Sequence, residues 1–156
     1  MRMFAAIGFV LVMAPALAAA QAQGALPWKP ADPAPAIAGI HLRESREQVE
    51  AALGGPDEAK NVAGGATTLT WRSRGIAVVF APKVGAAIIS YLTRQAGDIG
   101  GVAIGDTKQS VQDRWGVGTI NTSNGWVYRM DTWVVALSFD PITNVVNQLG
   151  IGVPNR

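Results

Sequence analysis

One stretch of sequence occurs twice in this chain, first as Gly39-Ile-His-Leu-Arg-Glu-Ser-Arg-Glu-Gln-Val-Glu-Ala-Ala-Leu-Gly-Gly-Pro56 and again as Gly101-Val-Ala-Ile-Gly-Asp-Thr-Lys-Gln-Ser-Val-Gln-Asp-Arg-Trp-Gly116. The two versions align without a gap, and the alignment pairs residues of similar chemistry: Leu42 with Ile104, Ser45 with Thr107, Val49 with Val111, Leu53 with Trp115 and Gly54 with Gly116. Short runs with β-like alternation follow each version. The sequence therefore predicts two copies of one unit, a helix followed by strands.

Each unit begins with a short helix whose start and end are marked in the sequence. Ser45 and Gln48 have the spacing of a capping box, in which each side chain satisfies a free backbone donor. Thr107 is the corresponding N-cap candidate in the second unit. Apolar residues between 49 and 53 recur at helical spacing, and Gly54-Gly55-Pro56 ends the first helix. Helices this short need to pack against a sheet, because they are not stable alone.

Three runs with the period-two alternation of strands follow each helix. Their ranges are 67–72, 76–80 and 86–92 in the first unit, and 126–130, 133–139 and 145–151 in the second. We therefore predict an α+β fold, a tandem repeat of one helix with a three-stranded antiparallel meander, with both helices on one face of the sheet. Residues 39–94 and 101–152 are the two repeats, and together they form one folded domain. Seven large side chains are predicted to anchor its core: Trp71, Phe80, Trp115, Trp126, Trp133, Leu137 and Phe139.

The N-terminal part of the chain has the features of an export signal. Arg2 precedes an apolar run from 4 to 16, and small residues follow at 18–20 and 20–22. This pattern predicts a signal peptide over residues 1–22, cleaved near Ala20–Ala22. Residues 23–38 contain four prolines between 27 and 35, which predicts an extended tether. Trp28 either packs on the domain or forms a docking peptide, and the sequence does not choose between them.

Composition excludes several classes of protein and site. The 156-residue chain contains no cysteine, so it has no disulfide, no thiol nucleophile and no lipid-anchor cysteine. No apolar run after the signal peptide is long enough to span a bilayer. The formal net charge is only +2, without a basic cluster, which argues against a nucleic-acid partner. The prediction is a periplasmic or secreted protein.

No set of residues in the sequence matches a known type of catalytic or metal site. His41 is the single histidine, and its i, i+3 spacing to Glu44 supplies at most two metal ligands. No Gly-x-Ser-x-Gly elbow and no phosphate-binding loop occur. Paired catalytic carboxylates stay possible, because such residues can be far apart in sequence. We therefore expect a protein that is not an enzyme, with no cofactor and no metal ion.

The strand alternation also predicts which side chains lie on the sheet face opposite the helices. That face carries small, polar and charged residues: Thr68, Thr70, Arg72, Val127, Arg129, Ala136, Ser138 and Asp140. Such a face is either plain solvated surface or a binding surface for another protein. If it binds a partner, the candidate residues are Thr70, Arg72, Arg129, Ser138 and Asp140.

The spacing Leu42-x-x-Ser45-x-x-x-Val49-x-x-x-Leu53-Gly54-x-Pro56, followed by the Trp71 strand and by Gly75-Ile76-x-Val78-x-Phe80, resembles the SmpA/OmlA (BamE-like) domain family. A tandem of such units is similar to the β-lactamase inhibitor protein fold. The resemblance covers about residues 39–152, although the chain lacks the lipid-modified cysteine of the BamE-like proteins. It implies a protein-binding module.

These observations predict a non-enzymatic periplasmic or secreted protein that binds another envelope or extracellular protein, in envelope assembly or as an inhibitor. The alternative is a small secreted hydrolase or a carrier of a small ligand. A large closed pocket lined by Trp126, Tyr128 and Trp133, with ionisable groups at its mouth, would favour that alternative.

Overall fold

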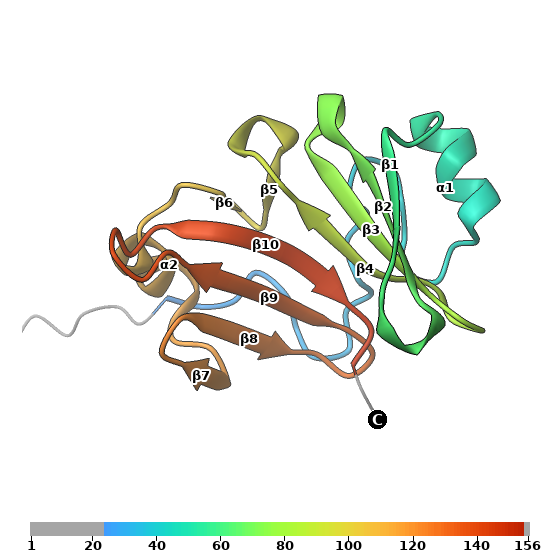
Figure 1. The fold of residues 1–156 in the computed structure, drawn as a ribbon. Coiled ribbons are helices and arrows are strands. Elements are labelled where there is room, and N and C mark those ends of the chain that lie inside the picture. Colours follow the sequence, from blue (N-terminus) through green and yellow to red (C-terminus); the bar gives the residue numbers. More distant parts are fainter. Residues whose placement is uncertain (1–23, 155–156) are drawn as a thin grey trace, which may run out of the picture.

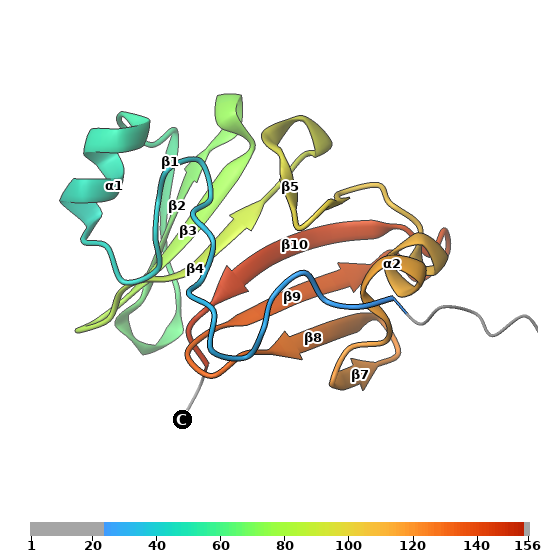
Figure 2. The same ribbon diagram turned by 180° about the vertical axis from the view of Figure 1, so that it is seen from behind.

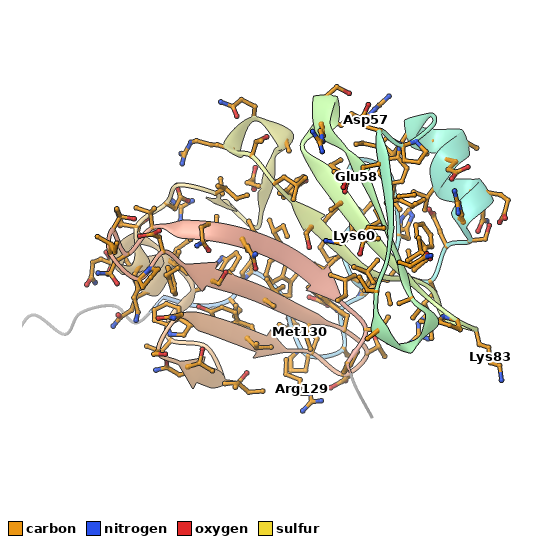
Figure 3. The ribbon with its side chains drawn as sticks, viewed as in Figure 1. Asp57, Glu58, Lys60, Lys83, Arg129 and Met130 are labelled. Carbon is orange, nitrogen blue, oxygen red and sulfur yellow. The ribbon has the colours of Figure 1, made fainter. Side chains whose placement is uncertain are left out.

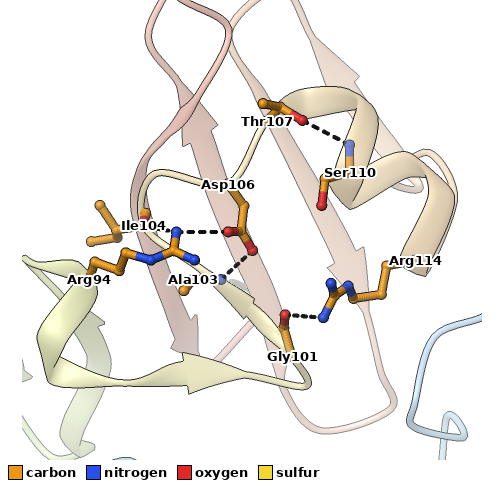
Figure 4. Close-up of polar contacts among 8 residues, drawn as sticks. All are labelled: Arg94, Gly101, Ala103, Ile104, Asp106, Thr107, Ser110 and Arg114. Carbon is orange, nitrogen blue, oxygen red and sulfur yellow. Dashed lines mark hydrogen bonds and ion pairs between the residues drawn. The ribbon is translucent and has the colours of Figure 1, made fainter.

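Two short helices form where the sequence places their caps. Helix α1 spans Arg46–Leu53, and helix α2 spans Lys108–Trp115. The Ser45 hydroxyl accepts a hydrogen bond from the Gln48 N–H at 3.3 Å, and the Gln48 side chain accepts one from the Ser45 N–H at 2.8 Å, so the predicted capping box is present. The Thr107 hydroxyl accepts from the Ser110 N–H at 3.1 Å (Figure 4). Both helices end at a glycine with a positive φ, +85° at position 54 and +76° at position 116.

The computed structural model describes residues 24–154, and its main feature is one antiparallel sheet of eight strands (Figure 1). The order across the sheet is β1-β2-β3-β4-β10-β9-β8-β7. The strands of the first half are β1 (Glu58–Asn61), β2 (Thr67–Trp71), β3 (Ile76–Ala81) and β4 (Gly85–Tyr91), and those of the second half are β7 (Ile120–Thr122), β8 (Gly125–Arg129), β9 (Val134–Phe139) and β10 (Val146–Gly152). Strands β5 (Asp98–Ile99) and β6 (Val102–Ala103) form a separate two-stranded sheet.

The predicted tandem repeat of one helix with a three-stranded meander is wrong. Instead of two three-stranded meanders, the described residues form one large eight-stranded sheet with two short helices, and each helix precedes four strands of that sheet. Prediction missed β1 and β7, the two edge strands. All of their residues are exposed, so neither strand shows the alternation by which a half-buried strand is recognised. Pairing of β4 with β10 joins the halves into one sheet.

One face of the sheet is covered by both helices and by the N-terminal segment 24–40, as Figure 2 shows. Buried side chains of that face reach the helix ends: the Trp71 indole N–H donates to the Gly54 carbonyl at 2.8 Å, and the Tyr128 hydroxyl donates to the Gly116 carbonyl at 2.8 Å. Of the seven predicted anchors, all but Phe80 are among the buried residues. Phe80 is partly buried and packs against the core.

The segment predicted as a tether lies along this covered face. The ring of Trp28 makes edge contacts with Trp115 and Trp133, at centroid distances of 5.5 and 5.3 Å. The Trp133 indole N–H donates to the Asp32 carbonyl at 2.8 Å, and Ile37 is fully buried. Of the two alternatives for Trp28, packing on the domain is the one in the structure.

A polar joint connects the end of the first half to α2 (Figure 4). The Arg94 guanidinium donates to the Asp106 carboxylate at 2.8 Å and to the Ile104 carbonyl at 3.1 Å. The other oxygen of Asp106 accepts from the Ala103 N–H at 3.0 Å. Arg114, in the last turn of α2, donates to the carbonyl of Gly101. These contacts fix the chain direction into α2.

No helix within residues 24–154 has the length and apolar character needed to cross a lipid bilayer. The predicted signal peptide and its cleavage sites lie outside the described residues.

Candidate functional site

The sheet face opposite the helices, here called the open face, is defined by two rows of residues that the strand register aligns. The first row is Lys60, Thr68, Val79, Ile88, Gly152, Val134 and Arg129. The second row is Glu58, Thr70, Ala77, Ser90, Gly150, Ala136, Val127 and Ile120. In both rows the charged residues lie on edge or near-edge strands, and the central strands carry small or apolar residues.

The open face contains a hollow of about 510 Å³ over the second half of the sheet. Its lining includes Ile88 and Ser90 of β4, Ile120 of β7, Arg129 of β8 and Ala136 of β9. In Figure 1, β10, β9 and β8 present this face to the viewer, while β1 to β4 stand at a steep angle to them. The hollow therefore lies over the second half of the sheet, next to the bend, with β4 at its border.

Small residues where β4 meets β10 and two irregularities in register accompany this bend. Strand β10 presents Gly150 and Gly152 to the open face, beside Ser90 and Ala136 of its neighbours. The register shifts once in β3 and once in β10, and such bulges increase local twist and bend the strand. The floor of the hollow is thus largely backbone and small side chains.

Large apolar side chains at the hollow are exposed to solvent. Ile88 is 44% exposed, and Ile120 is 48% exposed. Both line the hollow, together with Val127 and Val134. Exposed apolar residues that are scattered singly need no explanation, whereas a group of them in a concavity indicates an interaction site.

The predicted site residues Arg129 and Ser138 line the hollow. Arg129 is exposed at the end of β8. The Ser138 hydroxyl lies 2.8 Å from the side-chain oxygen of Asn147 and 3.3 Å from that of Gln148. Thr70 lies in the second row on β2, outside the hollow. The alternation of β8 and β9 thus brings two of the five predicted residues together.

Arg72 lies at the β1 edge, away from the hollow. It begins a 3-10 turn after β2, and its guanidinium donates to the Glu58 carboxylate at 2.7 Å. This hydrogen bond holds the pKa of Glu58 below its ordinary value. The Arg72 side chain is 73% exposed, so the pair contributes little to stability. It does, however, neutralise the one carboxylate of the two rows.

Asp140 organises the turn between β9 and β10. One carboxylate oxygen accepts hydrogen bonds from the backbone N–H groups of Ile142 and Thr143 at 2.9 and 2.8 Å, and from the Thr143 hydroxyl at 3.0 Å. Hydrogen bonds from these backbone groups lower the pKa of Asp140. The structure gives this residue a local role in the turn.

Replacing Asp140 with alanine is expected to lower the melting temperature at neutral pH, and the difference from the wild type should shrink in acid. Because the folded-state pKa lies below the ordinary value of 3.8, the carboxylate stabilises fully above that value and loses its effect as the pH falls through the folded pKa. Thermal unfolding of both proteins from about pH 7 to about pH 2 measures this. Asp131→Ala, at an exposed aspartate, is the control. A constant difference across the range would contradict the role of the charge.

Several residues of the hollow were not predicted as site residues. Ile88, Gly150 and Gly152 come from β4 and β10, which pair in the middle of the sheet. Strand β4 contains Ile88 and Ile89 in succession, and two adjacent apolar residues hide which one faces the core. The sequence of β10 did indicate which residues face away from the core, because Gly150 and Gly152 alternate with the apolar Leu149 and Ile151.

Three aromatic residues that would line the pocket of a hydrolase or carrier do not line the hollow. Trp126, Tyr128 and Trp133 are each 1% exposed and belong to the core on the covered face. Burial raises the pKa of Tyr128, which keeps its hydroxyl protonated. His41 lies before α1, where its ring nitrogen is 3.1 Å from Glu44, and its side chain is 62% exposed. Among residues 24–154, no group of three potential metal ligands occurs.

Comparison of the sequence with family models and with curated proteins gives no match. Three solved structures are similar in fold. An extracellular protein containing an SCP domain from Bacillus anthracis has a TM-score of 0.60 at 11% identity, over 72% of this chain and 44% of that one. A cysteine-rich secretory protein from Staphylococcus aureus has a TM-score of 0.60 at 8% identity, over 85% and 48%. A DUF4309 family protein from Bacillus subtilis has a TM-score of 0.53 at 15% identity, over 74% and 83%.

At these identities the likeness shows the fold alone. The chain spans less than half the length of the first two structures. The resemblance to SmpA/OmlA domains stays a prediction.

Proposed function

We propose that this chain is a secreted or periplasmic, non-enzymatic protein whose open face binds another extracellular or envelope protein. The observation that carries the proposal is the hollow on that face, with Ile88 and Ile120 exposed in it. A sheet face that only meets water is normally polar, and an apolar concavity gains free energy when a partner covers it.

Export is supported by the N-terminal sequence, with Arg2 ahead of the apolar run 4–16 and small residues at 18–22. Two of the structurally similar proteins are described as an extracellular and a secretory protein. Envelope assembly and enzyme inhibition are the two roles that such a binding protein would serve.

The chemistry at the hollow supports binding over catalysis. Arg129 is the one ionisable side chain among the described residues that line it. Ser138 contacts the amide side chains of Asn147 and Gln148, neither of which is a general base. A nucleophilic serine needs a base within hydrogen-bond reach, and these neighbours supply none.

A small-ligand carrier is the second candidate, because a hollow of about 510 Å³ falls within the range of small-molecule sites. The hollow is open to solvent on a sheet face, whereas small-molecule sites usually enclose most of their ligand. Native mass spectrometry of the purified protein tests this candidate, since a carrier retains a small molecule of defined mass.

Replacing Ala136 with arginine is expected to weaken partner binding strongly without unfolding the protein. Ala136 is exposed in the floor of the hollow, so a long charged side chain fills the space that the partner would occupy. We expect the affinity for envelope or extracellular proteins to fall by at least about tenfold. Quantitative affinity purification from envelope and culture fractions, followed by mass spectrometry, measures this loss.

The matched control is Ile142→Arg in the turn after β9. Ile142 is 88% exposed and does not line the hollow, so the same charge and bulk there should leave binding unchanged. Equal melting temperatures of the two variants exclude unfolding as the cause. Partners retained by the A136R protein would show that the open face is not the binding surface.

A further inference from the structure

We infer that strand β1 is a self-association edge, where β1 of a second copy of this chain pairs antiparallel about a two-fold axis centred on Ala59. Such pairing joins the eight-stranded sheets of the two copies into one continuous sheet. The hollow lies over the other half of the sheet, so this inference does not rest on the proposed function.

Strand β1 is an open edge of the sheet. It comes first in the order across the sheet, and no other strand within residues 24–154 pairs with its outer side. All four of its residues are exposed. The small side chain of Ala59 leaves the backbone accessible in the middle of this edge. Edges of this kind present N–H and C=O groups to which another strand can bind.

The direction of the backbone groups decides which residues of β1 can bind a second strand. The Val62 N–H donates to the Ala66 carbonyl at 2.9 Å, so it points toward the β2 side. Backbone groups alternate in direction along a strand, so those of Lys60 also point toward β2, where this residue pairs with Thr68. The N–H and C=O of Ala59 therefore point outward. In a two-fold pairing centred there, Ala59 of each copy donates to and accepts from Ala59 of the other.

The charges of β1 are complementary to themselves in this register. Glu58 and Lys60 flank Ala59 on the strand, and Figure 3 labels both. Pairing centred on Ala59 sets Glu58 of each copy opposite Lys60 of the other, so two opposite-charge pairs form. Side chains that face each other in this way have Cβ atoms about 4.5–5.5 Å apart.

Glu58 also has partners within its own chain. The Arg72 guanidinium donates to its carboxylate at 2.7 Å, and Lys60 acts on it electrostatically. Its own Lys60 is two residues along the strand, or about 6.6 Å away. Lys60 of the second copy lies closer than that. The added attraction is modest at an exposed edge, so the charges contribute mainly to the choice of register.

The neighbouring registers bring like charges together. The smallest shift that keeps outward-pointing backbone groups opposite each other is two residues. Such a shift centres the pairing either on Glu58, which then faces Glu58 of the second copy, or on Lys60, which then faces Lys60. Like charges directly opposite each other are destabilising. The edge therefore favours one defined dimer over pairing in several registers.

Sedimentation velocity of the purified protein over a range of concentrations tests this inference. A four-residue edge supplies few contacts, so we expect a dimer with a Kd on the order of 100 µM. Ala59→Pro should weaken association by at least about tenfold, because proline removes the N–H that the second copy needs. The fold should tolerate it, since this N–H faces solvent at an edge. The matched control is Ala59→Val, which keeps the N–H and should associate as the wild type does.

Two charge variants test the register. K60E sets acidic side chains opposite each other and E58K sets basic ones, so each variant alone should associate about tenfold more weakly than the wild type. A mixture of the two variants restores opposite charges at both positions and should recover the association of the wild type. A mixture that associates no better than its components would overturn the inferred pairing.

The outcomes separate this inference from the proposed function. The A136R variant changes the hollow and not β1, so it should dimerise as the wild type does. Self-association that is lost in A136R but kept in A59P would belong to the open face, and the β1 edge would be ruled out. A wild type that stays monomeric at about 1 mM would also overturn this inference, and it would leave the binding of another protein at the open face unaffected.

Discussion

Replacing Trp28 with alanine is expected to lower the free energy of unfolding by about 3 kcal/mol. The partly buried ring packs edge-on against both Trp115, at the end of α2, and Trp133, just before β9, and its removal takes away both contacts. The loss also weakens the attachment of the whole N-terminal segment, because that segment contacts the core through few large side chains. Chemical denaturation in urea, followed by tryptophan fluorescence or circular dichroism, measures the change.

Lys29→Ala is the matched control for Trp28. It is the next residue in the same segment, but its side chain is exposed, so a change within about 0.5 kcal/mol is expected. If the two variants were equally stable, segment 24–40 would not belong to the folded core. The proline-rich composition alone did not distinguish these possibilities, because it constrains the backbone and says nothing about what the tryptophan contacts.

The helices were predictable because their signals are local. The reciprocal hydrogen bonds of Ser45 and Gln48 involve residues three apart, and glycines 54 and 116 end the helices at a positive φ, which residues with a Cβ rarely adopt. Such features depend on a few neighbouring residues, so they can be identified in the sequence without knowledge of the fold.

The sheet was not predictable to the same extent, because its edges and centre depend on contacts distant in sequence. Strands β1 and β7 exist only because β2 and β8 pair with them, and their own residues carry no alternation. The pairing of β4 with β10 joins residues some sixty positions apart, such as Tyr91 with Leu149. Nothing local to either strand encodes that contact.

The candidate site shows the same division. Alternation within β8 and β9 is enough to put Arg129 and Ser138 on the open face. Arg72 and Asp140 follow the last residues of β2 and β9. Alternation predicts the sheet face of a residue only within a strand, so local hydrogen bonds determine where these two side chains lie. The hollow itself arises from the bend of the sheet, which becomes visible only once β4 and β10 are adjacent.

That bend leads to the second large effect, which is expected for Gly150→Ala. A methyl group at position 150 would lie 2.7 Å from the Ile89 carbonyl oxygen and 2.6 Å from the Ser90 hydroxyl. The hydroxyl can rotate away, but the carbonyl belongs to β4 and moves only if the two central strands separate. We expect a loss of about 2–3 kcal/mol in the free energy of unfolding, measured by urea denaturation.

The same substitution two residues later should have no such cost. At Gly152 the added methyl group meets nothing closer than 3.5 Å, although this residue belongs to the same strand and the same face. Gly152→Ala is therefore expected to be neutral or to stabilise the fold by up to about 1 kcal/mol, because alanine restricts the unfolded chain. The difference between the two variants measures how closely β4 and β10 approach at the centre of the sheet. Equal stabilities would mean that the strands are free to move apart there, and the hollow of the open face would then lack the rigid floor that the proposed partner binding requires.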